Sequence, residues 1–204
     1  MAANPERRAQ LADAGLRVLG ADGARKLTHR AVDREAGVPL GTCANYFPTR
    51  DELLGALGAR IFERLAPEPD RLESLAGRTP DVDLYVDYMR YLVERTTAQP
   101  DLTVALMELR LESRRSPGLA EVLGATLSRN YRLDVEFNDA AGLPATALDV
   151  ALLHFAIDGL LLDLLTTSIG ADATPDQLVT ALVTRLLARP GIGPLSAPPA
   201  PRAE

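Results

Sequence analysis

The segment from Leu27 to Leu54, LTHRAVDREAGVPLGTCANYFPTRDELL, constrains the fold of this chain more than any other part of the sequence. Thr28 is a suitable N-cap for a short helix, because its hydroxyl can accept a backbone N–H that otherwise lacks a partner. Gly37 can adopt the left-handed conformation that ends this helix, and Pro39 suits the start of a second one. Two short helices joined by a tight turn predict a helix–turn–helix, which can place a recognition helix in the DNA major groove.

The side chains of the first short helix divide into two faces. Ala31, Val32 and Ala36 form the apolar face. The polar side chains expected largely on the other face are Arg30, Asp33, Arg34 and Glu35. His29 has two open interpretations, a phosphate contact or a solvated residue at a helix start. Cys43 is interpreted as a small core residue rather than a redox sensor.

The segment Ala36–Leu54, AGVPLGTCANYFPTRDELL, resembles the signature of the TetR family of bacterial repressors, AGVS-x-GTLY-x-YF-x-S/T-K-x-E-LL. The matching residues are Gly37, Val38, Gly41, Thr42, Tyr46, Phe47, Glu52, Leu53 and Leu54. Upstream, the residues placed as in the first helix of that family are Leu11, Ala14, Leu16, Leu19 and Gly23. Two residues depart from the pattern: Ala44 replaces a usual Tyr, and Leu40 stands where a polar residue is frequent. Both departures reduce the polar surface that could contact DNA.

The predicted DNA contacts lie in or beside the helix–turn–helix. Thr42 and Asn45 could hydrogen-bond base edges or phosphates, and Leu40 could touch a thymine methyl. Arg50 begins a helix, where its charge and the helix dipole both favour a phosphate. The complete predicted set is Arg7, Arg8, Thr28, Arg30, Leu40, Thr42, Asn45, Tyr46 and Arg50. The alternative is a three-helix packing unit with no DNA role.

The charge is distributed unevenly along the chain. The formal net charge is −6, yet residues 1–50 contain eight Lys or Arg against five Asp or Glu. The basic end is therefore the end that contains the helix–turn–helix. Local charge rather than the total sets the attraction to phosphate, so the acidic total does not exclude DNA as a partner.

The rest of the chain shows helical periodicity and no strand pattern, so the predicted fold is all-α with about nine helices. Three helices form a DNA-binding domain over 1–50, and a helical domain for ligand binding and dimerisation covers 51–189. A connecting region is expected between 66 and 80, and helices are expected over 81–98, 100–116, 118–137, 144–169 and 174–189. Residues 190–204 are rich in Pro, Gly and Ala and predict a disordered tail.

The last two helices predict a homodimer. The helix within 144–169 is apolar on nearly all sides, so it must be buried against several neighbours. Pairing both helices with their symmetry mates would give a four-helix bundle. The candidate interface residues are Leu152, Gly159, Leu162, Leu178, Leu182 and Leu186. The alternative is that these helices pack only within one monomer.

The family resemblance implies a small-molecule pocket within residues 81–169. The candidate lining residues are Tyr85, Tyr88, Met89, Met107, Tyr131, His154, Phe155 and Asp158. His154 and Asp158 are four residues apart on one helix face and could bind a ligand from an apolar wall. They could equally satisfy each other or a partner subunit. An apolar or amphipathic effector is the hypothesis.

Enzymatic catalysis is not expected, because two His and one Cys give no recognisable nucleophile, base or metal set. No cofactor or metal is predicted, and no membrane segment, since the longest apolar run contains His154, Asp158 and Asp163. A single Cys suits a reducing cytoplasm. The expected function is a ligand-responsive DNA-binding transcriptional regulator, most simply a repressor that acts on a palindromic operator. The alternative is a helical small-molecule-binding protein of the same fold without specific DNA binding.

Overall fold

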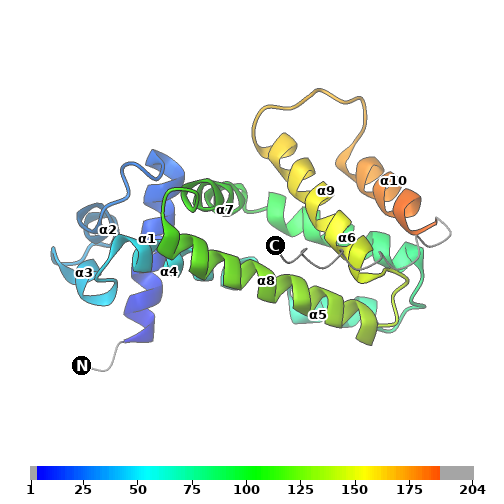
Figure 1. The fold of residues 1–204 in the computed structure, drawn as a ribbon, viewed down its shortest axis with the longest axis horizontal. Helices are drawn as coiled ribbons and strands as arrows, with labels where there is room; N and C mark the ends of the chain where they lie inside the picture. The colour runs from blue at the N-terminus through cyan, green and yellow to red at the C-terminus, as the bar shows by residue number, and fades with distance from the viewer. Residues whose placement is uncertain (1–3, 189–204) are drawn as a thin grey trace, which may run out of the picture.

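The computed structural model describes residues 4–188, and every regular element in that range is a helix (Figure 1). The all-α prediction is confirmed. The helices in chain order are α1 (Pro5–Asp22), α2 (His29–Ala36), α3 (Thr42–Tyr46), α4 (Arg50–Arg64), α5 (Pro69–Ala76), α6 (Val82–Thr97), α7 (Pro100–Glu112), α8 (Pro117–Ala140), α9 (Ala147–Leu165) and α10 (Pro175–Leu187). The predicted tail over 190–204, and Arg189 at the expected end of the last helix, lie outside the described residues.

The described range has ten helices where about nine were predicted, because α5 lies in the segment expected to be a connection. Pro69 occupies the first turn of α5, where its missing N–H costs no hydrogen bond. Leu72 and Leu75, three residues apart, pack against the core beside α6. An eight-residue helix has few periodic positions, so it is hard to recognise until its apolar side is buried.

Local capping interactions set most helix boundaries. Thr28 accepts a hydrogen bond from the Ala31 N–H at 3.1 Å, and Gly37 ends α2 with φ +66°, both as predicted. Pro39 does not start the second helix; Gly41 (φ +92°) precedes α3, and Pro39 lies in the turn. The predicted start of α9 was also wrong, because a capping box between Thr146 and Asp149 begins that helix after Pro144.

The C-terminal end of α9 is earlier than predicted. The helix was expected to reach Ile169 but ends at Leu165. The Asp163 carboxylate accepts hydrogen bonds from the Ser168 hydroxyl at 2.8 Å and the Ile169 N–H at 2.7 Å. These bonds fold the following segment back over the last turn, and they hold the pKa of Asp163 below its usual value.

Two apolar clusters form the interior. The first joins α1–α4 with parts of α7 and α8; its fully buried members include Leu11, Phe47, Leu57 and Leu109. The second contains side chains of α5, α6, α9 and α10. Helix α8 extends from the end that contains α1–α4 toward the other end of the molecule (Figure 1). Helix α4, which the sequence assigned to the C-terminal domain, shares its core with the helix–turn–helix.

Candidate nucleic-acid interface

The turn between α2 and α3 is held by a buried carboxylate. Asp33 is 0% exposed, and its Oδ2 and Oδ1 accept hydrogen bonds from the N–H groups of Gly41 and Cys43, each at 2.7 Å. The sequence placed Asp33 on the solvent side of α2, which is wrong. The side chain points toward α3, where it supplies the acceptor that the N–H groups at the helix start lack. The position of Asp33 within the periodicity of α2 does not predict its hydrogen bonds to Gly41 and Cys43.

Cys43 lies on the buried side of α3, as the core interpretation predicted. Its side chain packs in the first core with Leu27, Val32 and Phe47, all 0% exposed. Burial, reinforced by the nearby Asp33 charge, raises the pKa of the Cys43 thiol to about 12. The thiol is therefore protonated at neutral pH.

Two basic side chains hold the end of α3. His29 Nε2 donates to the Phe47 carbonyl oxygen at 2.6 Å. Arg8 donates through Nη1 to the Tyr46 carbonyl at 3.1 Å, and its guanidinium lies 4.5 Å from the centroid of the Phe47 ring. His29 is therefore half-buried, and its Nε2 binds a backbone carbonyl, a role that neither interpretation of the sequence gave it. Arg8, a candidate DNA contact, has an intramolecular role here.

Arg50 also has intramolecular partners. Its guanidinium donates to the carbonyl oxygens of Leu27 at 2.6 Å and Ala24 at 2.7 Å, and it lies 3.6 Å from a carboxylate oxygen of Glu112. These contacts connect the loop before α2 with α4 and α7. The sequence predicted a phosphate contact from the helix-start position of Arg50, and that position carries no information about the two carbonyls.

The exposed surface of the helix–turn–helix contains several of the predicted contacts. Leu40 is 67% exposed, and Asn45 and Arg30 are also exposed. Thr42 is half-buried and donates its hydroxyl hydrogen to the Pro39 carbonyl at 2.6 Å, so toward DNA this hydroxyl can only accept. Within residues 4–188, Asn45 is therefore the side chain of α3 with an uncommitted amide for base edges.

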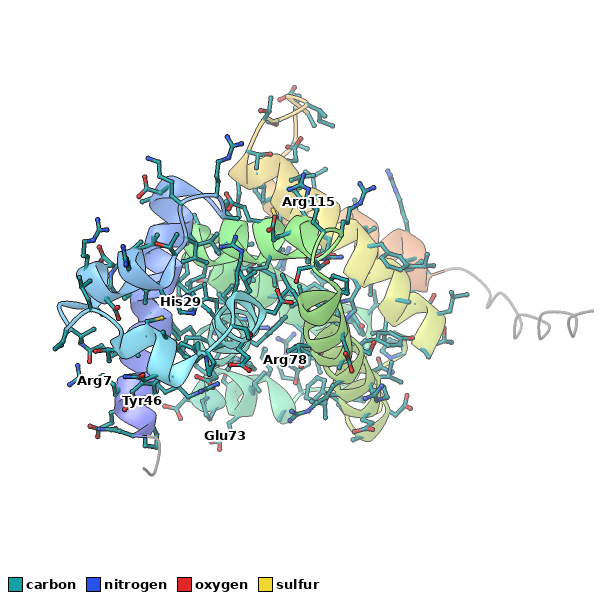
Figure 2. The ribbon with its side chains drawn as sticks, turned by 60° about the vertical axis from the view of Figure 1, so that its left-hand side comes forward. Arg7, His29, Tyr46, Glu73, Arg78 and Arg115 are labelled. Carbon is teal, nitrogen blue, oxygen red and sulfur yellow. The ribbon has the colours of Figure 1, made fainter. Side chains whose placement is uncertain are left out.

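Further predicted residues cluster at the same end of the molecule. Figure 2 shows Arg7, His29 and Tyr46 together beside α1–α3. Tyr46 is half-buried against the first core. No ion pair involves Arg7 or Arg30 among the described residues, in contrast to Arg17, which pairs with Glu35 at 2.6 Å. Among the predicted basic contacts, Arg7 and Arg30 thus have neither an ion pair nor a side-chain hydrogen bond in this part of the chain, whereas Arg8 has no ion pair but donates to the Tyr46 carbonyl.

The eight candidate ligand residues gather around α6–α9, and several belong to the second core. Tyr85 and Tyr88 are buried, and burial raises the pKa of both, to about 12 for Tyr85. Met89, Met107 and Tyr131 pack against this core. Phe155, by contrast, is 70% exposed and does not belong to the same interior.

His154 and Asp158 do not satisfy each other. His154 Nε2 lies 3.0 Å from Asp134 Oδ2 on α8, and Arg110 Nη1 on α7 lies 2.5 Å from Asp158 Oδ2. The mutual pairing kept open by the sequence is therefore wrong. Each residue instead connects α9 to a different neighbouring helix.

Two surface hollows occur elsewhere. One of about 730 Å³ lies between α5, α6 and α10 and is lined by residues that include Arg71, Arg90 and Tyr91. The other, of about 370 Å³, lies along α10. Neither is lined by any of the eight candidate ligand residues. Among residues 4–188, no group of three or more His, Cys, Asp or Glu could hold a metal ion.

Within the same described range, no helix combines the length and apolarity needed to cross a membrane.

Comparison with known proteins shows similarity to two transcriptional repressors. Over 78 residues the chain is 40% identical to the HTH-type transcriptional repressor KstR of Mycolicibacterium smegmatis and 36% identical to KstR of Mycobacterium tuberculosis. The match covers 38% of this chain and 38% and 35% of those relatives. The chain thus aligns with little more than a third of their length.

Solved structures match over nearly the full length. The multidrug binding protein EbrR, solved in complex with imidazole, has a TM-score of 0.69 and 29% identity, and the match covers 93% of this chain and 99% of that one. Its complex with ethidium has a TM-score of 0.67 and 28% identity, covering 89% and 98%. A transcriptional regulator of Streptomyces coelicolor, SCO7518, shares the fold at 21% identity, with a TM-score of 0.68 and coverage of 91% and 100%.

The family model described as the Tetracyclin repressor-like C-terminal domain matches residues 80–189, more than half of the chain. This match begins at residue 80, whereas the N-terminal signature ends at Leu54, so the two observations come from separate parts of the chain. Together with the helix–turn–helix over α2 and α3, they show that this chain belongs to the TetR family of transcriptional regulators.

Proposed function

We propose that this protein is a transcriptional repressor that binds a palindromic DNA operator as a homodimer and is released by a small, largely apolar effector. The observation that carries the proposal is the α2–α3 unit, in which the buried Asp33 carboxylate holds a short helix while Leu40 and Asn45 remain exposed. The similarity to KstR, which is an HTH-type transcriptional repressor, supports repression rather than activation.

In the proposed interface, different side chains contact the phosphates, the base edges and the thymine methyl groups. Arg7 and Arg30 would neutralise phosphates, and Asn45 would read a base edge in the major groove. Leu40 would contact a thymine methyl. Thr42 would accept a hydrogen bond, since its own hydrogen is used by Pro39. The remaining candidates, Arg8, Thr28, Tyr46 and Arg50, would contribute by holding the recognition unit in shape.

A dimer would bury the exposed apolar face of α9 and α10. Phe155 is 70% exposed and Leu162 is 51% exposed, which is unusual for large apolar side chains in a helix that is apolar nearly all round. The hollow along α10 is lined by Leu178, Ala181, Leu182, Arg185 and Leu186. Together with Leu152 and Gly159, this face would form a twofold bundle. Two recognition helices would then face successive major grooves about 34 Å apart.

The effector would bind among α6, α7, α8 and α9. EbrR has been solved in complex with ethidium, proflavin and malachite green, which are organic dyes with extended aromatic systems. For this chain, Tyr85, Tyr88, Met89 and Tyr131 would supply the aromatic and polarisable contacts such a ligand needs. Since these residues are packed in the second core, binding would open that core and shift the equilibrium away from the DNA-bound shape.

One observation favours the second candidate function, a helical ligand-binding protein without specific DNA affinity. Ala44 is exposed on α3 at the position where the family signature has Tyr, so a phosphate-contacting hydroxyl is missing there. DNA binding would then depend more heavily on Asn45 and Arg30.

The test is a selection of bound sequences from a random DNA pool, followed by fluorescence anisotropy with the selected duplex. We expect a palindromic site whose affinity falls with salt. The double variant Arg30→Ala with Asn45→Ala should lose at least tenfold in affinity. Arg132→Ala, which removes an exposed charge from α8, serves as the matched control and should bind within twofold of the wild type.

The same complex tests the effector. Ethidium or proflavin, used as probes, should lower the anisotropy of labelled operator at concentrations that do not displace a control repressor from its own site. Enrichment of no sequence above the starting pool would contradict the repressor assignment and favour the ligand-binding alternative.

A further inference from the structure

The recognition helix α3 lacks a cap of its own. It is five residues long, and the residue before it, Gly41, has no side chain to accept a hydrogen bond from the first turn. Helices this short are unstable by themselves, because the cost of forming the first turn is not recovered by propagation. Something outside α3 must therefore hold its start.

Asp33 fills this role from the middle of α2. One carboxylate oxygen accepts the Gly41 N–H and the other accepts the Cys43 N–H, both at 2.7 Å. A planar carboxylate bound through both oxygens fixes position and angle together, and its charge is favourable beside a helix N-terminus. The Asp33 side chain is 0% exposed, and its bond to the Cys43 N–H is buried, whereas its bond to the Gly41 N–H is part-buried.

The opposite end of α3 is held from the same helix. His29, the first residue of α2, donates to the Phe47 carbonyl at 2.6 Å. Helix α2 therefore contacts both ends of α3 through side chains, whereas the exposed residues Leu40 and Asn45 make no hydrogen bonds through their side chains within residues 4–188. Contacts that fix the helix and contacts available to DNA are made by different residues.

We propose that Asp33 is a positioning residue of the DNA interface, whose buried carboxylate sets the orientation of α3 on α2 and thereby aims Leu40 and Asn45 into the major groove. The proposal rests on the proposed function. It predicts that loss of Asp33 weakens sequence-specific binding more than non-specific binding. Sequence-specific binding depends on the orientation of α3 relative to the base edges, whereas non-specific binding depends on the charge of surface arginines.

The test compares Asp33→Asn with Asp13→Asn. Asparagine at 33 keeps the size and one acceptor oxygen, but its amide N–H₂ faces a backbone donor. Asp13 is a matched control because its carboxylate also accepts two hydrogen bonds, from Nε and Nη2 of Arg60 at 2.9 Å each, and it lies between α1 and α4, away from α3. Asp33→Ser, which leaves room for a bridging water, replaces the first variant if that variant unfolds at the assay temperature.

Two readouts separate positioning from general destabilisation. In the free protein, amide hydrogen exchange at Gly41 and Cys43 should accelerate at least tenfold in the Asp33 variant and stay within twofold in the Asp13 variant. On DNA, the ratio of affinities for the selected site and a scrambled site should fall at least tenfold only in the Asp33 variant, while affinity for scrambled DNA stays within twofold.

The outcomes distinguish this proposal from the function on which it rests. A wild-type protein without sequence preference overturns the repressor function and with it the DNA role of Asp33. A wild-type preference that survives in the Asp33 variant, or that falls equally in the Asp13 variant, overturns only the positioning role. Unchanged exchange at Gly41 and Cys43 does the same.

Discussion

Arg110 of α7 and Asp158 of α9 form an ion pair between helices, with 2.5 Å between Nη1 and Oδ2. The side chains are 41% and 46% exposed, so water and salt screen their attraction. A double-mutant cycle of Arg110→Met and Asp158→Asn should give a coupling free energy of about 0.2–1 kcal/mol. Urea unfolding of the four proteins measures it, and a value above about 2 kcal/mol would contradict the screening argument.

Arg50 and Arg30 should differ in how they affect DNA binding. Arg50→Ala removes two hydrogen bonds to the Leu27 and Ala24 carbonyls, so it should lower the free energy of unfolding by about 1–3 kcal/mol. Arg30→Ala should leave stability within about 0.5 kcal/mol. In anisotropy titrations over a salt series, only Arg30→Ala should reduce the slope of log affinity against log salt, by about one. An equal reduction for Arg50→Ala would establish the phosphate contact that its helix-start position predicts.

The exposed face of α9 should decide the oligomeric state. Leu162→Asp places a charge on a side chain that is 51% exposed in the isolated chain and would be buried in the proposed dimer. Sedimentation velocity should show the dimer dissociation constant rising at least tenfold, which corresponds to about 1.4 kcal/mol. Leu111→Asp is the control, since Leu111 is 65% exposed on α7. A monomeric wild type, or equal effects of the two variants, would contradict the proposed interface.

Cys43 should make the protein less stable at alkaline pH. Its thiol has a pKa of about 12 in the folded chain against a usual value of 9.0, so the unfolded chain loses this proton first as the pH rises. The contribution of the protonated Cys43 thiol to the free energy of unfolding is complete below pH 9. It is lost between pH 9 and pH 12, at up to about 1.4 kcal/mol per pH unit. Urea unfolding from pH 8 to 10.5 should therefore show a steeper decline for the wild type than for Cys43→Ala. Parallel declines would mean that the thiol titrates normally in the folded state.

The sequence by itself determined the features that depend on neighbours a few residues apart. Thr28 and Gly37 bound α2 as predicted, because a cap needs only the backbone of its own helix. The all-α fold followed from helical periodicity, and the family followed from a long motif around Gly37 to Leu54. Helix α5 was missed since eight residues carry too little periodicity.

The tertiary structure alone decided the partners of the polar side chains. Asp33 has the local appearance of a solvated helix residue, yet the angle between α2 and α3 turns it into the buried cap of α3. In the same way, His154 contacts Asp134 on α8 instead of Asp158 one turn along its own helix. The physical reason is that a carboxylate or imidazole binds whichever group the packing of helices brings within about 3 Å, and this geometry is set by the whole core and not by sequence spacing.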